Sequence, residues 1–332
     1  MNGTVHHLRE ALRLNPDNEA SRISREIREM MLGQIKRRGL VVGLSGGIDS
    51  SVTAALAVKA LGQDRVLGLL MPERNSSGDS LHLGKMVAGY LGIETVTEEI
   101  TNILEVVGFY QKYDSAVCRV IPEYGRGWKS KIVISNALKQ HSYASFYIVA
   151  QPKEGAVIKK RLSLEPYLEI VAATNFKQRI RKMLEYYHAD RLNYAVAGTP
   201  NRLEYDQGFF VKLGDGAADI KPIAHLYKSQ VYQLAEYFGI PEEIRQRKPT
   251  TDTYSLEQGQ DEFFFTLPYD QMDLCLFGKN NSVPAGDIAN ALGMPEQHIE
   301  IIYKDIDTKR ATTRYLHLSA LVMENGILSY TA

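Results

Sequence analysis

The chain has 332 residues, of which 44% are hydrophobic and 23% are charged. This composition suits one large globular domain, or a domain with a substantial insertion, with ample material for a hydrophobic core. Lysine and arginine together number 39, as do aspartate and glutamate. The balanced charge gives no general reason to expect a nucleic acid or a membrane surface as partner, and we expect neither.

Cysteine usage and the absence of long apolar runs bear on location. Cys118 and Cys275 lie far apart and lack the paired spacing of a zinc site, which argues against a disulfide framework or a metal–thiolate cluster. The N-terminal residues show no signal-peptide pattern, and no later stretch stays apolar long enough to span a bilayer. The sequence therefore predicts a cytoplasmic protein.

Strand and helix patterns alternate in the first third of the chain. Apolar residues recur every four positions in residues 20–35, which predicts an amphipathic helix. Residues 40–44 form a continuous apolar run, typical of a buried parallel strand, and a glycine pair then precedes a helix that ends near Leu61. Further strands are predicted at residues 65–70 and 93–97, and further helices at residues 80–91 and 102–110. This alternation predicts a doubly wound α/β fold with a mostly parallel sheet and helices on both faces.

The alternation is interrupted between about residues 114 and 174. Two strand-like runs, residues 143–150 and 157–164, flank a Pro-Lys-Glu-Gly sequence and predict a β-hairpin. We therefore interpret this region as an insertion. Its basic residues are Arg126, Lys129, Lys131, Lys139, Lys159, Lys160 and Arg161.

Regular alternation resumes after the insertion. The predicted elements are a helix at residues 176–188, a strand at residues 194–197, a glycine-rich loop through Asp219, and a helix at residues 227–238 that is closed by Gly239 and Pro241. From residue 269 onward the pattern indicates short helices. We expect a single domain over residues 1–332, with an N-terminal helical segment at residues 1–38 and a helical C-terminal region at about residues 268–332.

The clearest chemical signal lies where the first buried strand meets its helix. Paired glycines allow the backbone to approach a phosphate closely, while hydroxyls and the amides of the helix N-terminus donate hydrogen bonds to it. Any small-residue loop can join a strand to a helix, but that alternative is weak for the full heptad in this context. The predicted polyphosphate-binding residues are Ser45, Gly46, Gly47, Ile48, Asp49, Ser50 and Ser51.

This loop differs from a Walker A motif, because the terminal Gly-Lys-Ser/Thr is absent and Asp49 occupies the loop. A carboxylate beside phosphates requires a cation between them, which indicates Mg²⁺. The sequence SGGIDSS resembles the pyrophosphate-binding loop of the N-type ATP pyrophosphatases, a family whose members cleave ATP between the α and β phosphates.

The second half of the chain resembles one branch of that family, the ammonia-dependent NAD synthetases. Residues 175–228 contain Asn-x-x-x-Arg, Gly-Thr-x-Asn-x-x-Glu, Lys-x-Gly-Asp-Gly-x-Ala-Asp and Leu-x-Lys at matching spacing. The resemblance extends over roughly residues 23–273, except for the insertion. It implies an ATP-dependent ligase that activates a carboxylate as an acyl-adenylate and transfers it to ammonia. The reaction most directly implied converts deamido-NAD, ATP and ammonia to NAD, AMP and pyrophosphate.

The resemblance also implies roles for single residues. Asp49 and Glu204 would hold Mg²⁺, and Lys228 would neutralise the charge that develops as pyrophosphate leaves. Asp219 is a candidate for deprotonating ammonium, which makes Asp49, Lys228 and Asp219 the predicted catalytic residues. The family often carries an arginine where this chain has Leu70, and we expect Arg74 to serve instead.

Two further groups of contacts follow from the resemblance. Thr199 and Thr250 would contact ATP. The acid substrate would be bound by Arg179, Lys212, Asp215 and Asp219. The helix that carries Arg179 would expose basic residues in any case.

Three questions stay open at this point. The insertion is either a solvated hairpin or dimer contact, or a lid that admits a different carboxylic acid. A non-catalytic nucleotide-binding protein is the remaining alternative. Because the residues before the ATP loop cannot form a glutaminase domain, we expect free ammonia or a separate glutaminase as the nitrogen source. The resemblance also implies a homodimer.

Overall fold

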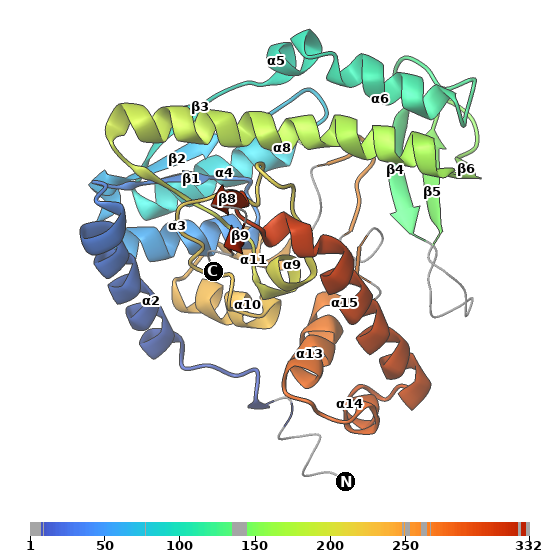
Figure 1. Cartoon of the computed structure of the whole chain (residues 1–332). Helices are drawn as coiled ribbons and strands as arrows, with labels where there is room; N and C mark the ends of the chain where they lie inside the picture. Colours follow the sequence, from blue (N-terminus) through green and yellow to red (C-terminus); the bar gives the residue numbers. More distant parts are fainter. Residues whose placement is uncertain are drawn as a thin grey trace.

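The computed structural model describes residues 8, 10–76, 78–134, 145–247, 249, 253–259, 264–265, 267–324 and 327–329. A central α/β unit is connected by one long helix, α8, to a small antiparallel sheet, and a helical group lies beside both (Figure 1). The described part of the central sheet has the spatial order β3 (Glu94–Thr97), β2 (Val66–Leu70), β1 (Leu40–Gly43) and β7 (Ala195–Ala197), all parallel.

Helices cover both faces of this sheet because its strands bury alternate residues on opposite sides. Leu40 and Val42 pack into a cluster with the first set of helices, whereas Val41 and Val196 pack against the other face, next to Ala189 of α8. The first set consists of α2 (Pro16–Met30), α3 (Ile48–Leu61), α4 (Gly78–Leu91) and α10 (Lys228–Tyr237). The predicted α/β class is confirmed, with a mostly parallel sheet between helices.

Local signals set the ends of the first helix. Asn15 caps α2 by accepting a hydrogen bond from the Asn18 amide at 3.0 Å, and Pro16 occupies the first turn, where no amide partner is needed. The helix continues as a π-helical turn, η1 (Met31–Ile35), and ends at Lys36, whose φ is 54°. The predicted apolar stripe at residues 20–35 therefore corresponds to one continuous helical segment.

Helix α8 (Leu164–Leu192) is much longer than predicted. The sequence pattern placed a helix at residues 176–188 and ended the insertion at residue 174, but the helix runs through that boundary. Pro166 lies in the first turn, where a missing amide costs nothing, and Tyr167, Ile170 and Val171 pack against the same cluster. The helix thus joins the small sheet to the central sheet, as Figure 1 shows.

The predicted β-hairpin is present, but it belongs to a three-stranded sheet. Antiparallel β5 (Phe146–Gln151) and β6 (Ile158–Arg161) form the hairpin, and β4 (Lys129–Ile134), which the sequence pattern did not indicate, pairs with the other edge of β5. The predicted helix at residues 102–110 is divided at Gly108, whose φ is 72°. The two resulting helices are α5 (Thr101–Val106) and α6 (Phe109–Cys118).

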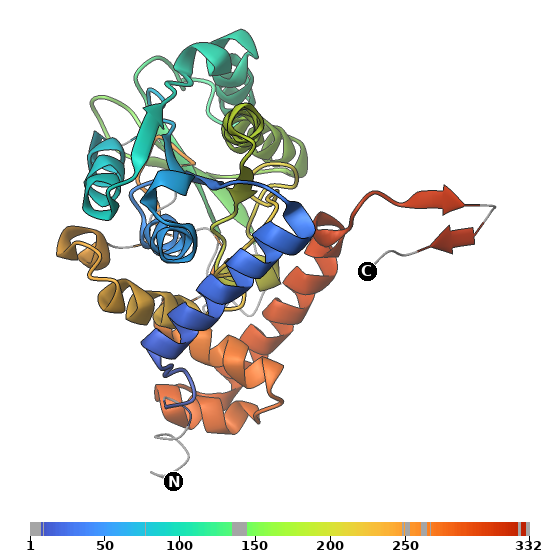
Figure 2. The same cartoon turned by 90° about the vertical axis from the view of Figure 1, so that its left-hand side faces the viewer.

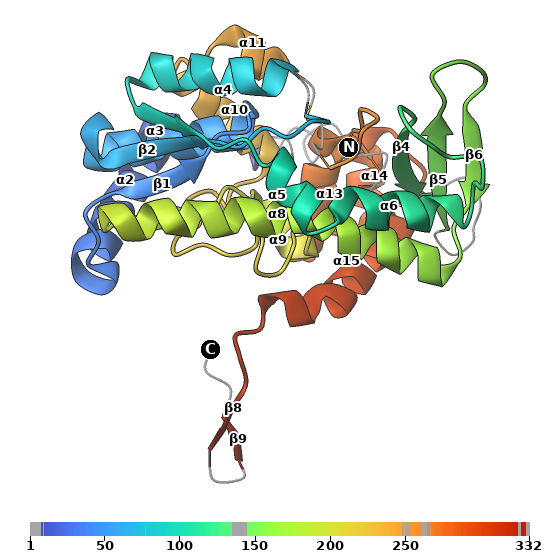
Figure 3. The same ribbon diagram turned by 90° about the horizontal axis from the view of Figure 1, so that it is seen from above.

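The C-terminal region is helical, as expected, but not all of its elements are short. It contains α13 (Tyr269–Asn280), α14 (Ala285–Leu292) and the 22-residue α15 (Glu296–His317). A hairpin of β8 (Val322–Glu324) and β9 (Ile327–Ser329), which was not predicted, projects away from the body of the molecule (Figures 2 and 3). The remaining elements are η2 (Gln63–Arg65), α9 (Arg202–Gln207) and α11 (Glu242–Gln246). Within the described residues, no helix is both long and apolar enough to span a bilayer.

Candidate active site

A cavity of about 860 Å³ opens at the carboxyl ends of the parallel strands and extends to the small sheet. Open α/β sheets bind ligands at this edge, because helix N-termini and loops meet there. One wall is formed by the loop between β1 and α3, and another by the segments after β7. The opposite wall comes from α8 and the small sheet.

The loop between β1 and α3 is folded by its small residues. Gly46 has a φ of +73°, and a Cβ there would lie 2.7 Å from the Leu83 Cβ, so only glycine fits. The Ser45 hydroxyl accepts a hydrogen bond from the Gly47 amide at 3.2 Å. Five of the seven predicted loop residues line the cavity, namely Ser45, Gly47, Ile48, Asp49 and Ser50. The loop thus presents the positive N-terminal end of α3 to the cavity.

The other two loop residues support the backbone. Gly46 is not among the residues that line the cavity, and neither is Ser51, which is fully buried. The Ser51 hydroxyl donates to the Gly47 carbonyl at 2.9 Å, one turn back along α3.

Asp49 is the centre of a polar network. Its Oδ2 pairs with the Nζ of Lys228, and its Oδ1 accepts a hydrogen bond from the Asn201 amide group at 3.1 Å. Asn201 also forms a capping box with Glu204. The side-chain oxygen of Asn201 accepts a hydrogen bond from the Glu204 backbone amide, and the Asn201 backbone amide donates to the Glu204 carboxylate. One asparagine therefore connects the two carboxylates that were predicted to hold a metal.

Lys228 is buried at the start of α10, with 2% of its side chain exposed. Burial by itself lowers the pKa of Lys228, but attraction to Asp49 and Glu204 outweighs it and raises the pKa. The ammonium group is thus held in its charged form. Behind it, Asp273 of α13 accepts hydrogen bonds from the Lys228 and Ser229 amides at 3.1 and 2.6 Å, which anchors the first turn of α10.

The remaining predicted ATP contacts divide into three cases. Thr199 follows β7 and lines the cavity. Thr250 lies outside the described residues. Arg74 is absent from the cavity lining: its guanidinium stacks 3.5 Å from the centroid of the Tyr110 ring and pairs with Glu105 at 3.1 Å. The structure therefore does not bring Arg74 to the phosphate loop.

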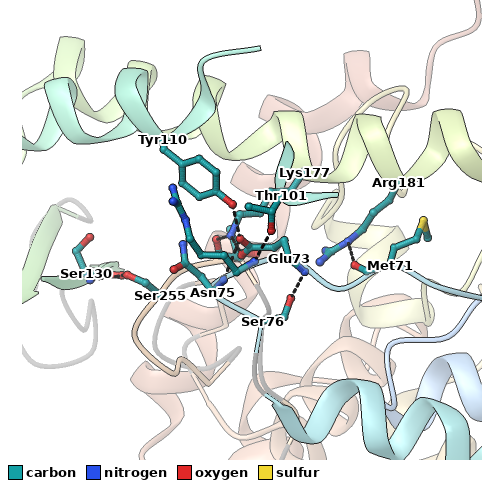
Figure 4. Close-up of polar contacts among 12 residues, drawn as sticks. Met71, Glu73, Asn75, Ser76, Thr101, Tyr110, Ser130, Lys177, Arg181 and Ser255 are labelled. Atoms are coloured by element: carbon teal, nitrogen blue, oxygen red, sulfur yellow. Dashed lines mark hydrogen bonds and ion pairs between the residues drawn. The ribbon is translucent and has the colours of Figure 1, made fainter. Parts of the chain in front are cut away.

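Arg181 of α8 lines the cavity where Arg74 was expected. Its Nε donates to the Met71 carbonyl at 3.4 Å, just beyond β2 (Figure 4). The sequence pattern could not separate Arg181 from the other basic residues of this helix, because helical spacing alone does not tell which face meets a cavity.

Three of the four predicted acid-binding residues line the cavity: Arg179, Lys212 and Asp215. The Arg179 Nε donates to the Lys212 carbonyl at 3.4 Å, and Asp215 accepts from the Val211 amide at 2.7 Å. Burial raises the pKa of Asp215. The Nζ of Lys212 donates to two carbonyls at the end of α15, so the C-terminal helix holds this cation.

Asp219, the fourth predicted acid-binding residue, does not line the cavity. Its Oδ2 accepts from the Val196 amide at 2.7 Å and its Oδ1 from the Tyr186 hydroxyl at 3.4 Å. Its Oδ2 thus supports the end of β7, and its Oδ1 contacts α8. The role of Asp219 in deprotonating ammonium stays a prediction.

The sequence did not predict a buried ion pair in the cavity wall. Lys182 and Glu185 of α8 line it at an Nζ to Oε2 distance of 2.5 Å, with at most 9% of either side chain exposed. Burial raises the pKa of Glu185, against the attraction of Lys182. A Cβ at position 43 would lie 2.8 Å from the Glu185 Oε1, so a larger residue there would displace the Glu185 carboxylate. Charges three residues apart on a helix were the available signal, but such pairs are usually solvated.

The small sheet contributes an apolar end to the cavity. Ile134 and Phe146 line it together with Tyr167 and Val171 of α8, and the rings of Phe146 and Tyr167 stack at a centroid distance of 4.1 Å. Most of the basic residues of the insertion are exposed, whereas Lys131 is half-buried and Lys139 lies outside the described residues. The sheet is therefore solvated on its basic side and faces the cavity with apolar residues.

Comparison with known proteins agrees with this geometry. The sequence model of the NAD synthase family matches residues 20–122 and 144–313. The chain belongs to the NAD synthase family. Residues 123–143, which include β4, lie outside the match. The predictions of family, of ATP as a substrate and of an ATP-dependent ligase are thereby confirmed.

Individual relatives cover nearly the whole chain. The NH3-dependent NAD+ synthetase of Mesorhizobium japonicum is 57% identical over 94% of this chain and 98% of its own length, and that of Rhizobium meliloti is 56% identical over 95% and 94%. Solved structures share the fold. An NMN synthetase from Francisella tularensis has a TM-score of 0.63 at 23% identity, covering 94% of this chain and 99% of that one. An NH3-dependent NAD synthetase from Campylobacter jejuni has a TM-score of 0.61 at 21% identity, with coverage of 94% and 100%.

Proposed function

We propose that this enzyme converts deamido-NAD, ATP and ammonia to NAD, AMP and pyrophosphate. The observation that carries the proposal is the network of Asp49, Asn201, Glu204 and Lys228 at the N-terminus of α3, at one end of a cavity that reaches the predicted acid-binding residues. The names of relatives at 56–57% identity support deamido-NAD as the acid.

In the first half-reaction, the substrate carboxylate attacks the α-phosphate of ATP and pyrophosphate leaves. The loop at residues 45–50 receives the phosphates, and its amides and hydroxyls donate to their oxygens. Lys228 is charged, buried and fixed at the start of α10, so it can stabilise the leaving pyrophosphate without reorganising.

The donor chemistry of Asp49 and Glu204 fits Mg²⁺. Mg²⁺ is usually held by one or two carboxylates together with substrate phosphates, and both side chains line the cavity. In the part of the chain that the structure describes, no group of three or more His, Cys, Asp or Glu side chains could hold a metal by itself. When bound, Mg²⁺ would offset the charge of the phosphates, and Asn201 would orient both carboxylates.

In the second half-reaction, ammonia displaces AMP from the acyl-adenylate and forms the carboxamide. We assign binding of the acid to Arg179, Lys212 and Asp215, with Asp219 supporting the strand behind them. Holding the acid beside the phosphate loop makes the attack on bound ATP effectively intramolecular, which supplies much of the rate enhancement of the first half-reaction.

The setting of the enzyme is part of the proposal. The family resemblance supports a homodimer and free ammonia, supplied directly or by a separate glutaminase. A cytoplasmic location is supported by Cys118 and Cys275, both of which are free. We also propose that residues 1–332 act as one domain, because the cavity is lined from the first strand to α15.

Purified protein incubated with ATP, Mg²⁺, ammonium and deamido-NAD tests the proposal. NAD and AMP, followed by chromatography, should appear in equal amounts. Pyrophosphate release with another acid, but not with deamido-NAD, would show that the cavity selects a different carboxylate. ATP binding without turnover on any acid would contradict a ligase.

A further inference from the structure

Residues 253–258 lie along the edge of β4 that β5 leaves free. The Ser130 amide donates to the Ser255 hydroxyl at 2.9 Å, and the Leu256 amide donates to the Ser130 carbonyl at 3.2 Å. Further along, the side-chain amide of Gln258 donates to the Ile132 carbonyl. The segment therefore satisfies backbone groups that an open strand edge would expose, and Figure 4 shows its first contact.

The edge of β4 is itself supported from behind. Ser130 is fully buried, and its hydroxyl lies 2.8 Å from the Tyr113 hydroxyl and 3.0 Å from the Tyr124 hydroxyl. Tyr113 belongs to α6, which packs along α8. Strand β4 is thus a fixed surface against which another segment can be positioned.

A buried ion pair holds the other end of the segment. Lys177 of α8 donates to the Thr253 carbonyl at 3.0 Å and pairs with Glu73 at 2.6 Å, with 2% and 0% of the two side chains exposed. The second oxygen of Glu73 accepts from the Tyr110 hydroxyl at 2.8 Å and from the Asn75 amide at 3.0 Å (Figure 4).

The surroundings of Glu73 favour its charged form. Burial by itself raises the pKa of Glu73, but the charge of Lys177 and the hydrogen bonds outweigh it and lower the pKa. A buried pair whose remaining hydrogen-bonding groups are also engaged is held in one geometry.

The pair lies behind the cavity wall. Neither Glu73 nor Lys177 lines the cavity, but their neighbours along the chain do, including Pro72 and Gln178. The segment that Lys177 holds contributes Thr253 to the same cavity. One ammonium group therefore connects the segment after β2, helix α8 and residues 253–258.

We infer that the β4 edge and the Glu73–Lys177 pair together form a seat that holds residues 253–258 and the cavity wall beside them in position for ATP. Lys177 is a positioning residue, since it touches the wall from behind. Strand β4, which lies outside the family match, thereby works as a support of the nucleotide site. The inference rests on the proposed function for the identity of the nucleotide.

Two variants distinguish an effect on the position of residues 253–258 from an effect on the stability of the fold. In Lys177→Met, Glu73 is left buried without its partner, so both the unfolding temperature and the affinity for a non-hydrolysable ATP analogue should fall. In the double variant Glu73→Gln, Lys177→Met no buried charge remains, and the unfolding temperature should recover most of the loss. Its affinity for the analogue should stay about tenfold below wild type, because the Thr253 carbonyl still lacks its charged donor.

Analogue binding is measured by calorimetry at constant Mg²⁺, with no acid substrate present. Ser255→Ala, which removes the acceptor of the Ser130 amide, should weaken binding about threefold, a fraction of one neutral hydrogen bond. Lys279→Met is the matched control, because it breaks a 2.6 Å pair with Asp307 outside the cavity lining and should leave affinity unchanged.

If both the double variant and Ser255→Ala bound the analogue with wild-type affinity, the β4 edge and the Glu73–Lys177 pair would not position the nucleotide site, and the inference would be wrong. That result would not bear on the proposed NAD-forming reaction. If the wild-type enzyme bound the analogue but made no NAD, the proposed reaction would be contradicted and the positioning role of residues 253–258 would not.

Discussion

The two ends of the cavity are built in different ways. At the phosphate end, Asp49, Asn201 and Lys228 meet through direct polar contacts at the starts of helices. At the other end, Phe146 and Tyr167 meet through an apolar stack between the small sheet and α8. Polar chemistry needs particular residue types at strand–helix junctions, whereas many large apolar residues can fill a wall. The phosphate end therefore has a sequence motif, and the apolar end has none.

Asp49→Asn should produce the largest effect, because it disrupts the polar network at the phosphate end of the cavity. Loss of the carboxylate removes a predicted Mg²⁺ ligand and the partner of Lys228, so acid-dependent pyrophosphate release should fall about a thousandfold or more. Circular dichroism would confirm that the fold is retained. Asp64→Asn, at an exposed position in η2, is the control. An active Asp49→Asn enzyme would refute the metal assignment.

Substitution of Asn201 should have the next largest effect, and it tests whether this residue bridges Asp49 and Glu204 at the phosphate end. Asn201→Ser can still cap α9 but is too short to bridge to Asp49, whereas Asn201→Ala loses both functions. We expect both variants to lose about 10- to 100-fold in kcat/KM for ATP, as for other groups that orient metal ligands. Only Asn201→Ala should also lose about 1 kcal/mol of stability in urea unfolding. Full activity in Asn201→Ser would contradict the bridging role.

Phe146→Ala tests the apolar end. Removing the ring that stacks on Tyr167 leaves a gap at the apolar end of the cavity, so KM for the acid substrate should rise about tenfold and KM for ATP should rise less. Tyr147→Ala, on the neighbouring residue that does not line the cavity, is the matched control. If KM for ATP changed as much as KM for the acid, the two ends of the cavity would not be separate.

The smallest expected effect concerns the support of Lys228 and depends on pH. Burial raises the pKa of Asp273 from 3.8 to about 6, partly opposed by the hydrogen bonds from the Ser229 and Lys228 backbone amides. Folding therefore favours the protonated form, so the stability contributed by this titration is present below pH 3.8 and is lost as the pH rises through about 6.

Asp273→Asn cannot titrate at this position. The unfolding free energy of wild type relative to Asp273→Asn should therefore decrease between pH 4 and pH 6, by about 1 kcal/mol or more. Urea unfolding at several pH values measures the difference. A difference that does not vary with pH would contradict the shifted titration.

Much of the fold could be predicted because its elements follow local patterns. The apolar run at residues 40–44 and the glycine pair after it correspond to β1 and the loop before α3. Strand β4 was missed because its residues, KSKIVI, carry little alternation and follow a glycine-rich stretch. The start of α8 was missed because residues 157–164 were predicted as a strand of the hairpin and the insertion was extended to residue 174, whereas the helix begins at Leu164.

The candidate site was predicted unevenly for a related reason. Asp49, Thr199, Glu204 and Lys228 were found through motifs, and all four line the cavity. Arg74 has suitable chemistry and lies near the site in sequence, but stacking on Tyr110 turns it elsewhere. Lys182 and Glu185 were missed, because nothing in a helical pattern distinguishes a buried ion pair from a solvated one.

The sequence by itself determined the alternating α/β architecture and the phosphate loop, because both depend on backbone geometry and chemistry within a few residues. Only the tertiary structure decided which groups meet across the cavity. Ser130 and Ser255 are 125 positions apart, and Glu73 and Lys177 are 104 apart. Such contacts arise from the packing of α8 and the small sheet, since the energy that orders them comes from burial shared by many residues.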